Sequence, residues 1–253
     1  MINVFQYWGQ GIENLPHFLK VINQHNMKLY TKHNINYFFI NDKNVHEYIS
    51  VPSIFYKLAY NFKSDIVRYY ILHKYGGFWF DTDVIIMKNL NILYESINKY
   101  ECILDVENYR NEIGCASLFL RKNSVASKFC VDYVNYVLKH KVNLVWGDIG
   151  PITAVNLYNK HPNLILLNKY DITKNGCNFI SWTDEPGINK YKWYLSSSVE
   201  AQKKAKELKE NTNMFYIITW TMYRIHDMGD NLSDIVFHDS NSVFFHLLQM
   251  SDT

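Results

Sequence analysis

The stretch "SDIVRYYILHKYGGFWFDTDVII", residues 64–86, decides the fold expected for this chain. It begins in a helical pattern that we expect to span 53–75. Gly76-Gly77 then supplies the left-handed residue that commonly ends a helix. An aromatic run follows the glycines and leads directly into Asp81-Thr82-Asp83. The stretch therefore predicts a helix that turns back sharply into a strand, with an acidic tripeptide at the end of that strand.

Asp81 and Asp83 are flanked by two short predicted strands, 78–80 and 84–87. Along a strand, residues i and i+2 point to the same side, so a D-x-D pair directs both carboxylates toward one point. Neighbouring carboxylates repel each other unless a positive group holds them together. The pair offers hard oxygen ligands for Mg²⁺ or Mn²⁺, which keep positions open for phosphate oxygens and water. A solvated turn is the alternative for such a tripeptide, but the apolar residues on both sides favour a metal.

Asp65 and Arg68 stand three residues apart in the predicted helix, so they share one helix face. They can form a local ion pair, or both can reach into one cleft. The glycine pair folds the helix back toward the strand that ends in Asp81, which favours the cleft. Arg68 offers a planar fork of donors that suits sugar hydroxyls or phosphate. Ser64 could cap the last part of the helix.

The N-terminal part has the order strand, helix, strand. "INVFQYW" (2–8) is a compact apolar and aromatic run, and a helix is expected over 15–32 with Pro16 in its first turn. "INYFFIND" (35–42) reads as a second strand, rich in β-branched and aromatic residues. This order predicts a βαβ unit with parallel strands, and hence an α/β protein.

Further elements are expected along the rest of the chain. The predicted strands are 101–106, 115–120, 163–167 and 214–220, and the predicted helices are 124–140 and 149–159. "VEAQKKAKELKE", 199–210, mixes charges of both signs at helical spacing and is expected to be a solvated helix face. The chain shows neither an internal repeat nor a linker, so one domain is the simpler expectation.

The composition fits a soluble α/β protein of one domain, or one domain with an added lobe. The chain has 253 residues, of which 48% are hydrophobic and 20% charged, with a formal net charge of +2. No basic block indicates nucleic acid as a partner. The N-terminus lacks the pattern of a secretory signal, and no apolar run approaches the ~18 residues that span a bilayer. We therefore expect a cytoplasmic protein without a transmembrane segment, able to work at a membrane surface.

The four cysteines stand alone along the chain. They occupy positions 102, 115, 130 and 177, without a C-x-x-C pair. This spacing fits neither a zinc site nor a small disulfide framework, so we expect reduced thiols in the core.

The pattern S-D-x-x-R, helix, G-G, apolar run and D-x-D resembles the central motif of DXD-containing sugar transferases. These comprise capsular polysaccharide synthesis proteins, glycosyltransferase family 32 and the large glucosylating toxins. "FQYWGQGIENLPHFLKVINQHN" (5–26) resembles the opening of the capsular group, and "FFINDKNVHEYI" (38–49) is similar to its second strand and following turn. "GDIGPITAVNLY" (147–158) resembles a Gly-Pro-x-x-Thr element of family 32. The resemblance covers residues 2–90 well and 147–158 loosely.

The resemblance implies a GT-A-type fold, a Rossmann-like nucleotide-binding sheet flanked by helices, with a less regular C-terminal region. Within a single domain over 1–253, residues 1–90 would form the nucleotide-sugar-binding core and 91–253 the acceptor-side and completing elements. The implied function is metal-dependent transfer of a sugar, with retention, from a UDP-sugar or another nucleotide diphosphate sugar to a hydroxyl of a glycan or other acceptor.

Residue roles follow from the same resemblance. Asp83 would bind Mn²⁺ or Mg²⁺ directly, and Asp81 would contact the ribose, the sugar or the water shell of the metal. Asp65 and Arg68 would hold the hydroxyls of the donor sugar. Trp8, at the end of the first strand, would lie against the nucleobase, with an ordinary core position as its alternative. Trp79 is expected to be a core residue.

The chain departs from these families toward its C-terminus. Many members carry a late His, or a Ser-Trp pair, that completes the metal or phosphate site. Here His226, beside Asp227, is the first candidate for a metal ligand, and His238 and Ser242 match less well. The carboxylates that could contact the acceptor, or be structural instead, are Asp105, Glu107 and Asp148.

Two other functions are compatible with the sequence. One is a non-catalytic nucleotide-sugar-binding or glycan-binding module that keeps the fold, favoured by the poor match of the C-terminal third. The other is a metal-dependent nucleotidyltransferase, which also uses paired aspartates. Such sites typically add a Gly-Ser element, and this chain has no Gly-Ser dipeptide.

Overall fold

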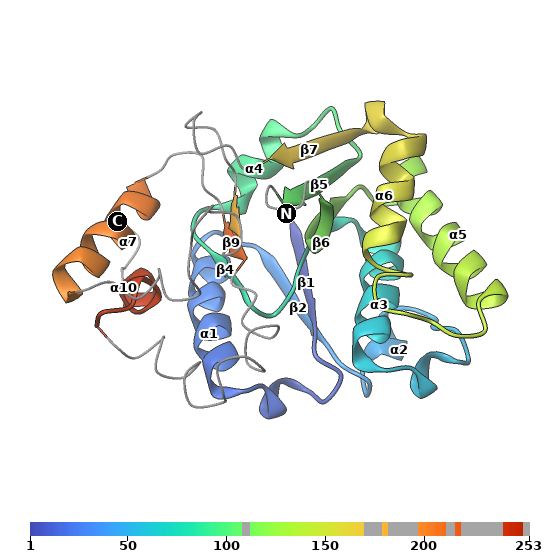
Figure 1. Cartoon of the computed structure of the whole chain (residues 1–253), viewed down its shortest axis with the longest axis horizontal. Helices are drawn as coiled ribbons and strands as arrows, with labels where there is room; N and C mark the ends of the chain where they lie inside the picture. The colour runs from blue at the N-terminus through green and yellow to red at the C-terminus, as the bar shows by residue number, and fades with distance from the viewer. Residues whose placement is uncertain (108–111, 170–178, 182–196, 211–215, 219–239, 250–253) are drawn as a thin grey trace.

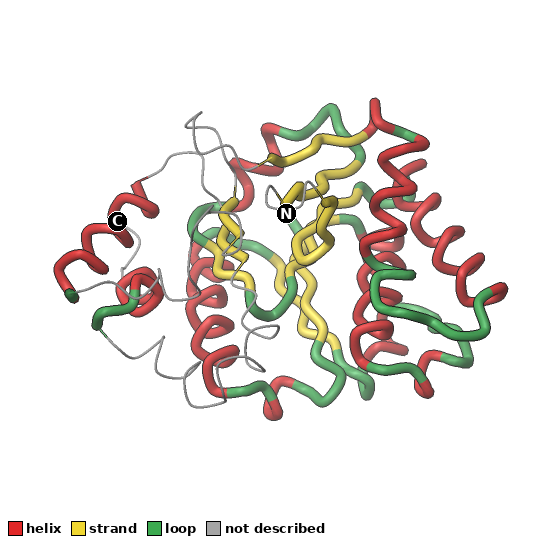
Figure 2. Tube along the Cα trace, in the orientation of Figure 1, coloured by secondary structure: helices red, strands yellow, loops and turns green. Residues whose placement is uncertain are grey.

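The computed structural model shows an α/β protein built around a central sheet (Figure 1). A second, smaller sheet lies beside it, and helices flank both (Figure 2). The residues that the structure describes are 1–107, 112–169, 179–181, 197–210, 216–218 and 240–249.

The central sheet has six strands in the order β2-β1-β3-β6-β5-β7. Its strands are β1 (Asn3–Tyr7), β2 (Asn36–Ile40), β3 (Gly77–Phe80), β5 (Cys102–Glu107), β6 (Glu112–Leu120) and β7 (Ile165–Lys169). β1 pairs in parallel with both β2 and β3, so the predicted βαβ unit is confirmed. β6 is inserted antiparallel between β3 and β5. The carboxyl ends of β1, β2 and β3 therefore meet at one edge of the sheet, where α/β proteins bind ligands.

Helices cover both faces of this sheet. The α-helices of this part are α1 (His17–Lys32), α2 (Val45–Tyr48), α3 (Tyr60–Tyr75), α4 (Leu90–Ser96), α5 (Val125–His140) and α6 (Pro151–Lys160). Short 3₁₀ helices are η1 (Ile12–Asn14), η2 (Phe55–Lys57) and η3 (Pro162–Leu164). In Figure 1, α1 lies on one side of the sheet, and α3, α5 and α6 lie on the other.

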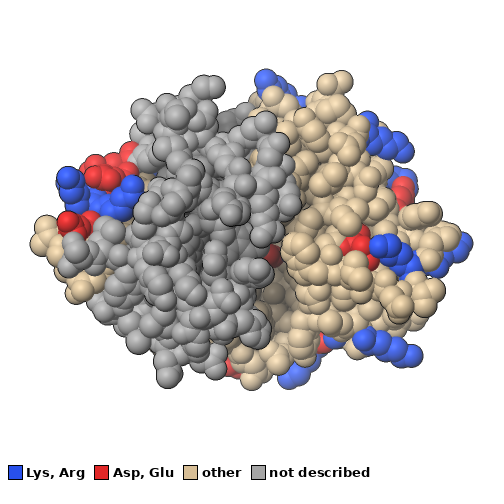
Figure 3. Space-filling model, viewed as in Figure 1, with Lys and Arg blue, Asp and Glu red and all other residues tan. Residues whose placement is uncertain are grey.

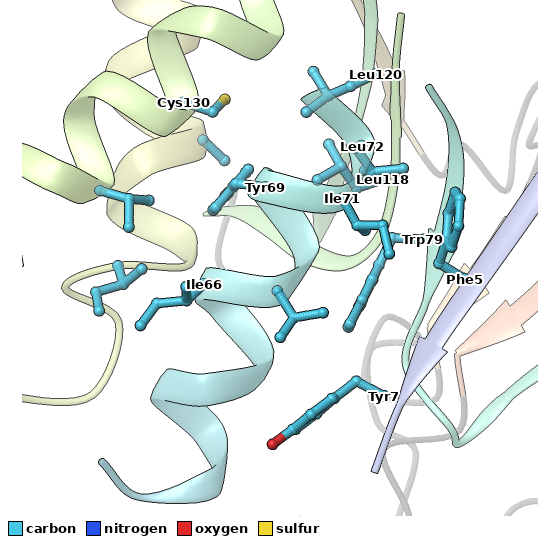
Figure 4. Close-up of a cluster of buried hydrophobic side chains, with 14 of the residues drawn as sticks. Phe5, Tyr7, Ile66, Tyr69, Ile71, Leu72, Trp79, Leu118, Leu120 and Cys130 are labelled. Atoms are coloured by element: carbon cyan, nitrogen blue, oxygen red, sulfur yellow. The ribbon is translucent and has the colours of Figure 1, made fainter. Parts of the chain in front are cut away.

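Alternate residues of the central strands enter two different cores. Phe5 and Trp79 belong to the core on the side of α3, as Figure 4 shows, whereas Val4, Phe78 and Phe80 belong to the core on the side of α1. Because neither face of the sheet meets water, both sets of alternating positions are apolar. This explains the uninterrupted apolar runs in these strands.

The connection from α3 to β3 depends on its two glycines. Gly76 has a φ of 68° and Gly77 a φ of 122°, so both adopt conformations that disfavour other residues. A Cβ on Gly77 would lie 2.3 Å from the carbonyl oxygen of Asn3 in β1. The predicted helix end is therefore confirmed, and the glycines let α3 fold back against the sheet. Ser64, however, lies inside α3 and does not cap it, because the helix begins at Tyr60.

A smaller part of the molecule contains the elements β4 (Val84–Ile86), β8 (Phe179–Ser181), β9 (Tyr216–Ile218), α7 (Ser198–Glu210) and α10 (Val243–Gln249). The three strands form a sheet in the order β4-β9-β8. α7 matches the predicted charged helix, but it is not solvated all round, because Ala201, Ala205 and Leu208 are buried. These residues pack with α10 and with apolar residues of α1.

No described helix combines the length and the hydropathy that crossing a bilayer requires. Cys102, Cys115 and Cys130 are buried free thiols, as predicted, and Cys177 lies outside the described residues. On the face shown in Figure 3, acidic and basic side chains of the described residues are interspersed rather than gathered into one field.

Candidate active site

Arg68 lies at the centre of the candidate site. Its side chain projects from α3 and is only 3% exposed. Its Nη2 donates a hydrogen bond to Asp81 Oδ1 at 2.9 Å, and its Nη1 lies 3.3 Å from Asp65 Oδ1. The guanidinium carbon lies 5.1 Å from the centre of the Trp79 ring. One arginine therefore joins a carboxylate of the helix to a carboxylate beyond the strand, so the local ion pair with Asp65 forms together with a long-range pair to Asp81.

The acidic tripeptide forms the turn between β3 and β4. The N–H of Val84 donates to the carbonyl of Asp81 at 3.1 Å, and the N–H of Asp81 donates to the carbonyl of Ala116 at 2.7 Å. The side chain of Asp81 accepts a further hydrogen bond from Trp79 Nε1 at 2.8 Å. The expectation of strand alternation for the two carboxylates is therefore wrong, because the tripeptide is part of a turn. The flanking strands are where they were predicted.

Asp65 contacts the N-terminus of α6. A Cβ placed on Gly150, the residue before that helix, would lie 2.5 Å from Asp65 Oδ1. The backbone N–H of Gly150 donates to the Asp65 carboxylate, and Tyr69 donates to the carbonyl of Gly150 at 2.7 Å. The loosely matched Gly-Pro segment is thereby brought against the strongly matched S-D-x-x-R segment. Only a residue without a side chain leaves room for Asp65 there.

Burial and charge oppose each other at these carboxylates. Burial raises the pKa of Asp65 to about 6, although the charge of Arg68 and the Gly150 N–H lower it. Burial likewise raises the pKa of Asp81, against the effects of Arg68 and Trp79. Burial lowers the pKa of Arg68, but the nearby negative charges outweigh this and raise it overall. Arg68 therefore stays charged and holds both carboxylates together.

Arg68 has donors to spare. Its Nε and Nη1 are buried and meet no acceptor at hydrogen-bond geometry in the described part of the chain, although the Cys115 sulfur, a weak acceptor, lies beside the guanidinium. Buried guanidinium donors are seldom left without an acceptor. Nη1 does have the attraction of Asp65 at 3.3 Å, but this contact lacks the geometry of a hydrogen bond. The arrangement is therefore suited to a ligand that brings oxygen acceptors, such as a sugar or a phosphate.

The chemistry of the donor set fits a divalent cation in part. Asp83 is buried, at 6% exposure, and Asp81 and Asp83 offer the carboxylate oxygens that Mg²⁺ and Mn²⁺ take. Within the described ranges, no group of three or more His, Cys, Asp or Glu side chains could hold a metal. His226, Asp227 and His238 lie outside those ranges. The pair thus fits an ion that keeps water and phosphate oxygens among its ligands.

Trp8 follows β1 at the carboxyl edge of the sheet. Its backbone N–H donates to the carbonyl of Ile40 at 3.0 Å, which extends the pairing with β2. The side chain is half-buried and packs against the cluster formed by α1, α7 and α10. Its Nε1 is buried without a hydrogen bond to a described residue. Contact with a nucleobase stays a prediction.

A buried ion pair beside Trp8 was not predicted. Lys63 of α3 bonds Asp42 Oδ2 at 2.6 Å, and the Tyr7 hydroxyl donates to Asp42 Oδ1 at 2.5 Å. The Tyr60 ring packs where a Cβ on Gly9 would lie. These contacts fix the segment after β1 relative to the start of α3. The sequence signal that could have pointed to this ion pair was the position of Asp42 at the end of a predicted strand.

The other candidate carboxylates have structural partners. Asp105 is 1% exposed and accepts hydrogen bonds from Ser117 and from Tyr216, the latter at 2.7 Å. Asp148 is 2% exposed and pairs with Lys141 at 2.6 Å. The side chain of Glu107 lies outside the described part. Asp105 thus links the two sheets. Contact of Asp105, Glu107 or Asp148 with an acceptor stays a prediction.

Cys115 of β6 is a site neighbour that sequence reasoning placed only in the core. Burial raises the pKa of its thiol, although the charge of Arg68 lowers it, and Asp65 and Asp81 act in the opposite sense. The thiol is therefore neutral beside the Arg68 cluster. No local sequence signal could have shown this, because it depends on the antiparallel insertion of β6 beside β3.

The sequence model of the capsular polysaccharide synthesis protein family matches residues 1–145, more than half of the chain. The chain belongs to this family. The matched residues include Trp8, Asp65, Arg68 and the acidic tripeptide. The predicted resemblance to capsular polysaccharide synthesis proteins, and with it the link to polysaccharide synthesis, is confirmed. No curated protein matches the sequence.

This capsular polysaccharide synthesis protein is similar in structure to known glycosyltransferases. One is a glycosyltransferase involved in the glycosylation of the major capsid of PBCV-1, with a TM-score of 0.53 and 12% identity, covering 92% of this chain and 98% of that chain. Mouse xyloside xylosyltransferase 1 gives a TM-score of 0.44 at 8% identity, covering 86% of this chain and 97% of its own. The galactosyltransferase LgtC gives 0.42 at 9% identity, covering 86% of each chain. The first likeness establishes the predicted GT-A fold.

Proposed function

We propose that this protein is a metal-dependent glycosyltransferase. It would transfer a sugar from a nucleotide diphosphate sugar, linked to UDP, to a hydroxyl of a glycan or another acceptor. The observation that carries the proposal is the buried Arg68, held between Asp65 and Asp81 with two nitrogen donors lacking a hydrogen bond in the described part of the chain. The family and the GT-A fold agree with it.

The described residues suggest a division of roles around the donor. Asp65 and Arg68 face one another at the carboxyl edge of the sheet, where they can bind the hydroxyls of the donor sugar. Asp81 is oriented by Arg68 and Trp79, which leaves its position well defined before a ligand arrives. Such preorganisation reduces the cost of ordering the site during the reaction. Trp8 at the end of β1 is suited to lie against the nucleobase.

Asp83 would hold Mn²⁺ or Mg²⁺, with Asp81 contacting its water shell or the donor. A divalent cation there neutralises the negative charge that the diphosphate gathers as it leaves. His226 stays the first candidate for a completing ligand. We further infer transfer with retention and a cytoplasmic location. The family resemblance supports the first inference, and the three buried thiols support the second.

Turnover of nucleotide sugars with and without Mn²⁺ tests the proposal. The purified protein should hydrolyse or transfer sugar from one donor of a panel, and Asp81→Asn together with Asp83→Asn should abolish this with a nearly unchanged melting curve. Asp132→Asn is the matched control, because Asp132 is an exposed residue of α5 paired with Lys128. Full activity in the double variant would refute the metal assignment. Metal-dependent binding of UDP without turnover of any donor would instead identify a non-catalytic binding module.

A further inference from the structure

The loop between α5 and α6 is closed by an internal ion pair. Lys141 Nζ bonds Asp148 Oδ1 at 2.6 Å, and the N–H of Val145 donates to Asp148 Oδ2 at 2.8 Å. These hydrogen bonds lower the pKa of Asp148, so the carboxylate stays ionised. The N–H of Ile152 also donates to the carbonyl of Gly147 at 3.1 Å. The loop therefore has a defined shape.

The tip of this loop exposes apolar side chains. Val142 is 96% exposed, Val145 62% and Trp146 74%, whereas Leu144 packs against the core. An indole ring with this much contact with water contributes little to folding. The loop thus presents one large aromatic face outward from a firmly held base, and such surfaces commonly bind a partner or ligand.

The loop ends at the candidate active site. Gly150 lies against the carboxylate of Asp65, with room for no Cβ between them. Trp146 is four residues before Gly150, so their Cα atoms lie within about 14 Å of each other. Gly147, directly after Trp146, has a φ of 90° and open space where a Cβ would be. The exposed Trp146 is therefore on the segment that leads into Gly150 and so to Asp65, one of the residues proposed to bind the donor sugar.

The chemistry of the tip favours a carbohydrate over a lipid surface. A pyranose ring has an apolar C–H face that matches the flat face of an indole, and polar edges that remain in water. Binding to an anionic membrane would draw on free basic residues beside the apolar ones. Lys141, the basic residue next to Val142, is instead engaged by Asp148, and the exposed Lys139 and His140 belong to the last turn of α5 rather than to the loop tip.

We propose that Trp146 is the platform on which a sugar ring of the acceptor stacks. This inference rests on the proposed glycosyltransferase function and names the acceptor class as a carbohydrate. Asp148 and Gly150 act as positioning residues, since one closes the loop and the other sets it against Asp65. The acceptor would lie on the indole with its reacting hydroxyl toward the donor sugar.

The test is binding of methyl pyranosides and the corresponding disaccharides of glucose, galactose, mannose and N-acetylglucosamine. Saturation-transfer NMR titrations measure this without any turnover, so a failure of the proposed enzyme activity does not affect the outcome. At least one glycoside should bind, and Trp146→Ser should weaken it by about two- to tenfold, the range of an aromatic contact. Trp146→Phe, which keeps an aromatic face, should retain most of the binding.

Val142→Ser is the matched control, because Val142 is the most exposed apolar residue of the same loop. Stacking on Trp146 predicts that this variant binds glycosides like the unchanged protein. Absence of binding across the whole panel, or equal loss in Val142→Ser and Trp146→Ser, would overturn the proposal. Cosedimentation with phosphatidylglycerol–phosphatidylcholine vesicles provides the other arm. Vesicle binding that both serine variants weaken, without glycoside binding, would assign the loop to a membrane instead.

Discussion

Helix α3 carries two buried cations, Lys63 and Arg68, and their hydrogen-bond partners differ. Lys63 is 5% exposed, bonds Asp42 at 2.6 Å and lies 5.0 Å from the centre of the Tyr60 ring. Arg68 is 3% exposed and pairs with two carboxylates, yet two of its nitrogens lack a hydrogen bond to any described residue. Both cations are buried and both contact aromatic rings. The Lys63 nitrogen has a hydrogen-bond partner, whereas two of the Arg68 nitrogens have none among the described residues.

This difference predicts that Lys63 stabilises the fold and that Arg68 binds a ligand. A buried cation whose partners satisfy it fixes the fold, and removing it leaves a buried charge without compensation. A buried cation with spare donors carries a desolvation cost that a ligand can offset. We therefore expect changes at Lys63 to affect stability first, and changes at Arg68 to affect donor binding and turnover first.

The largest expected effect is that of Arg68→Lys on turnover. Lysine keeps the positive charge between Asp65 and Asp81 but loses the planar fork that can serve them and a sugar together. We expect kcat/KM for the nucleotide sugar to fall by about 10²- to 10³-fold. The melting temperature should shift by only a few degrees. Arg121→Lys is the control, because Arg121 bonds backbone carbonyls away from the site. Equal losses of kcat/KM in both variants would show that Arg68 contributes no more to turnover than an arginine outside the site.

Lys63→Met should destabilise the fold more than it slows the reaction. It leaves the half-buried Asp42 carboxylate with the Tyr7 hydroxyl as its side-chain partner among the described residues. We expect the free energy of unfolding to fall by about 2–3 kcal/mol, measured by denaturant titration. The exposed Lys57→Met should change it by less than about 0.5 kcal/mol. If Lys63→Met keeps its stability but loses turnover, the contrast between the two cations is reversed.

Asp65, which lies beside Arg68, should make the free energy of unfolding depend on pH. The pKa of Asp65 is raised to about 6 in the folded state, above its value of roughly 3.9 in the unfolded chain. A raised pKa means that the folded state binds the proton more tightly. The associated stability is present below pH 4 and is lost as pH rises through about 6. Its size is on the order of 2 kcal/mol.

Unfolding curves of the unchanged protein and of Asp65→Asn between pH 4 and 7 measure this effect. The difference between them should shift in favour of the variant as pH rises, because asparagine carries no charge to bury. Turnover of the unchanged protein should rise over the same interval as Asp65 ionises. Parallel pH profiles for the two proteins would mean that Asp65 titrates normally.

The smallest expected effect is that of Gly150→Ala. Its Cβ would lie 2.5–2.7 Å from the atoms of the Asp65 carboxylate, which must then move relative to Arg68. The backbone conformation at Gly150, with a φ of −76°, suits alanine, so the fold should form. We expect turnover to fall by about tenfold, equivalent to about 1.4 kcal/mol. Ile152→Ala, at an exposed site two residues further along the chain, should leave turnover within about twofold.

Local patterns predicted much of the fold. The end of the helix before Gly76-Gly77, the strands on both sides of the acidic tripeptide and the parallel pairing of β1 with β2 are as expected. The start of that helix was predicted at residue 53, but α3 begins at Tyr60, after the separate 3₁₀ helix η2. These features depend on residue spacing within one or two elements, and such spacing is visible in a single sequence. The cap at Ser64 failed because the side chain falls inside a helix that begins four residues earlier.

Long-range contacts could not be predicted in the same way. Lys63 is a helix residue like many others until the fold brings it to Asp42. Cys115 is an isolated cysteine until β6 is inserted beside β3. Trp146 is one of six tryptophans, and only its exposure distinguishes it from Trp79 in the core.

The sequence by itself determined which residues form the candidate site: the short segment from Asp65 to Asp83 contains the arginine, the acids and the glycine turn that folds them together. Contacts across this segment close only a short loop, so local periodicity suffices to foresee them. The tertiary structure alone decided how Asp65 is held, because Gly150 reaches it from α6, more than eighty residues further along the chain. It also decided which nitrogen atoms of the buried Lys63 and Arg68 have a hydrogen-bond partner. Hydrogen-bond satisfaction depends on all the groups that surround a side chain, and those groups come from every part of the fold.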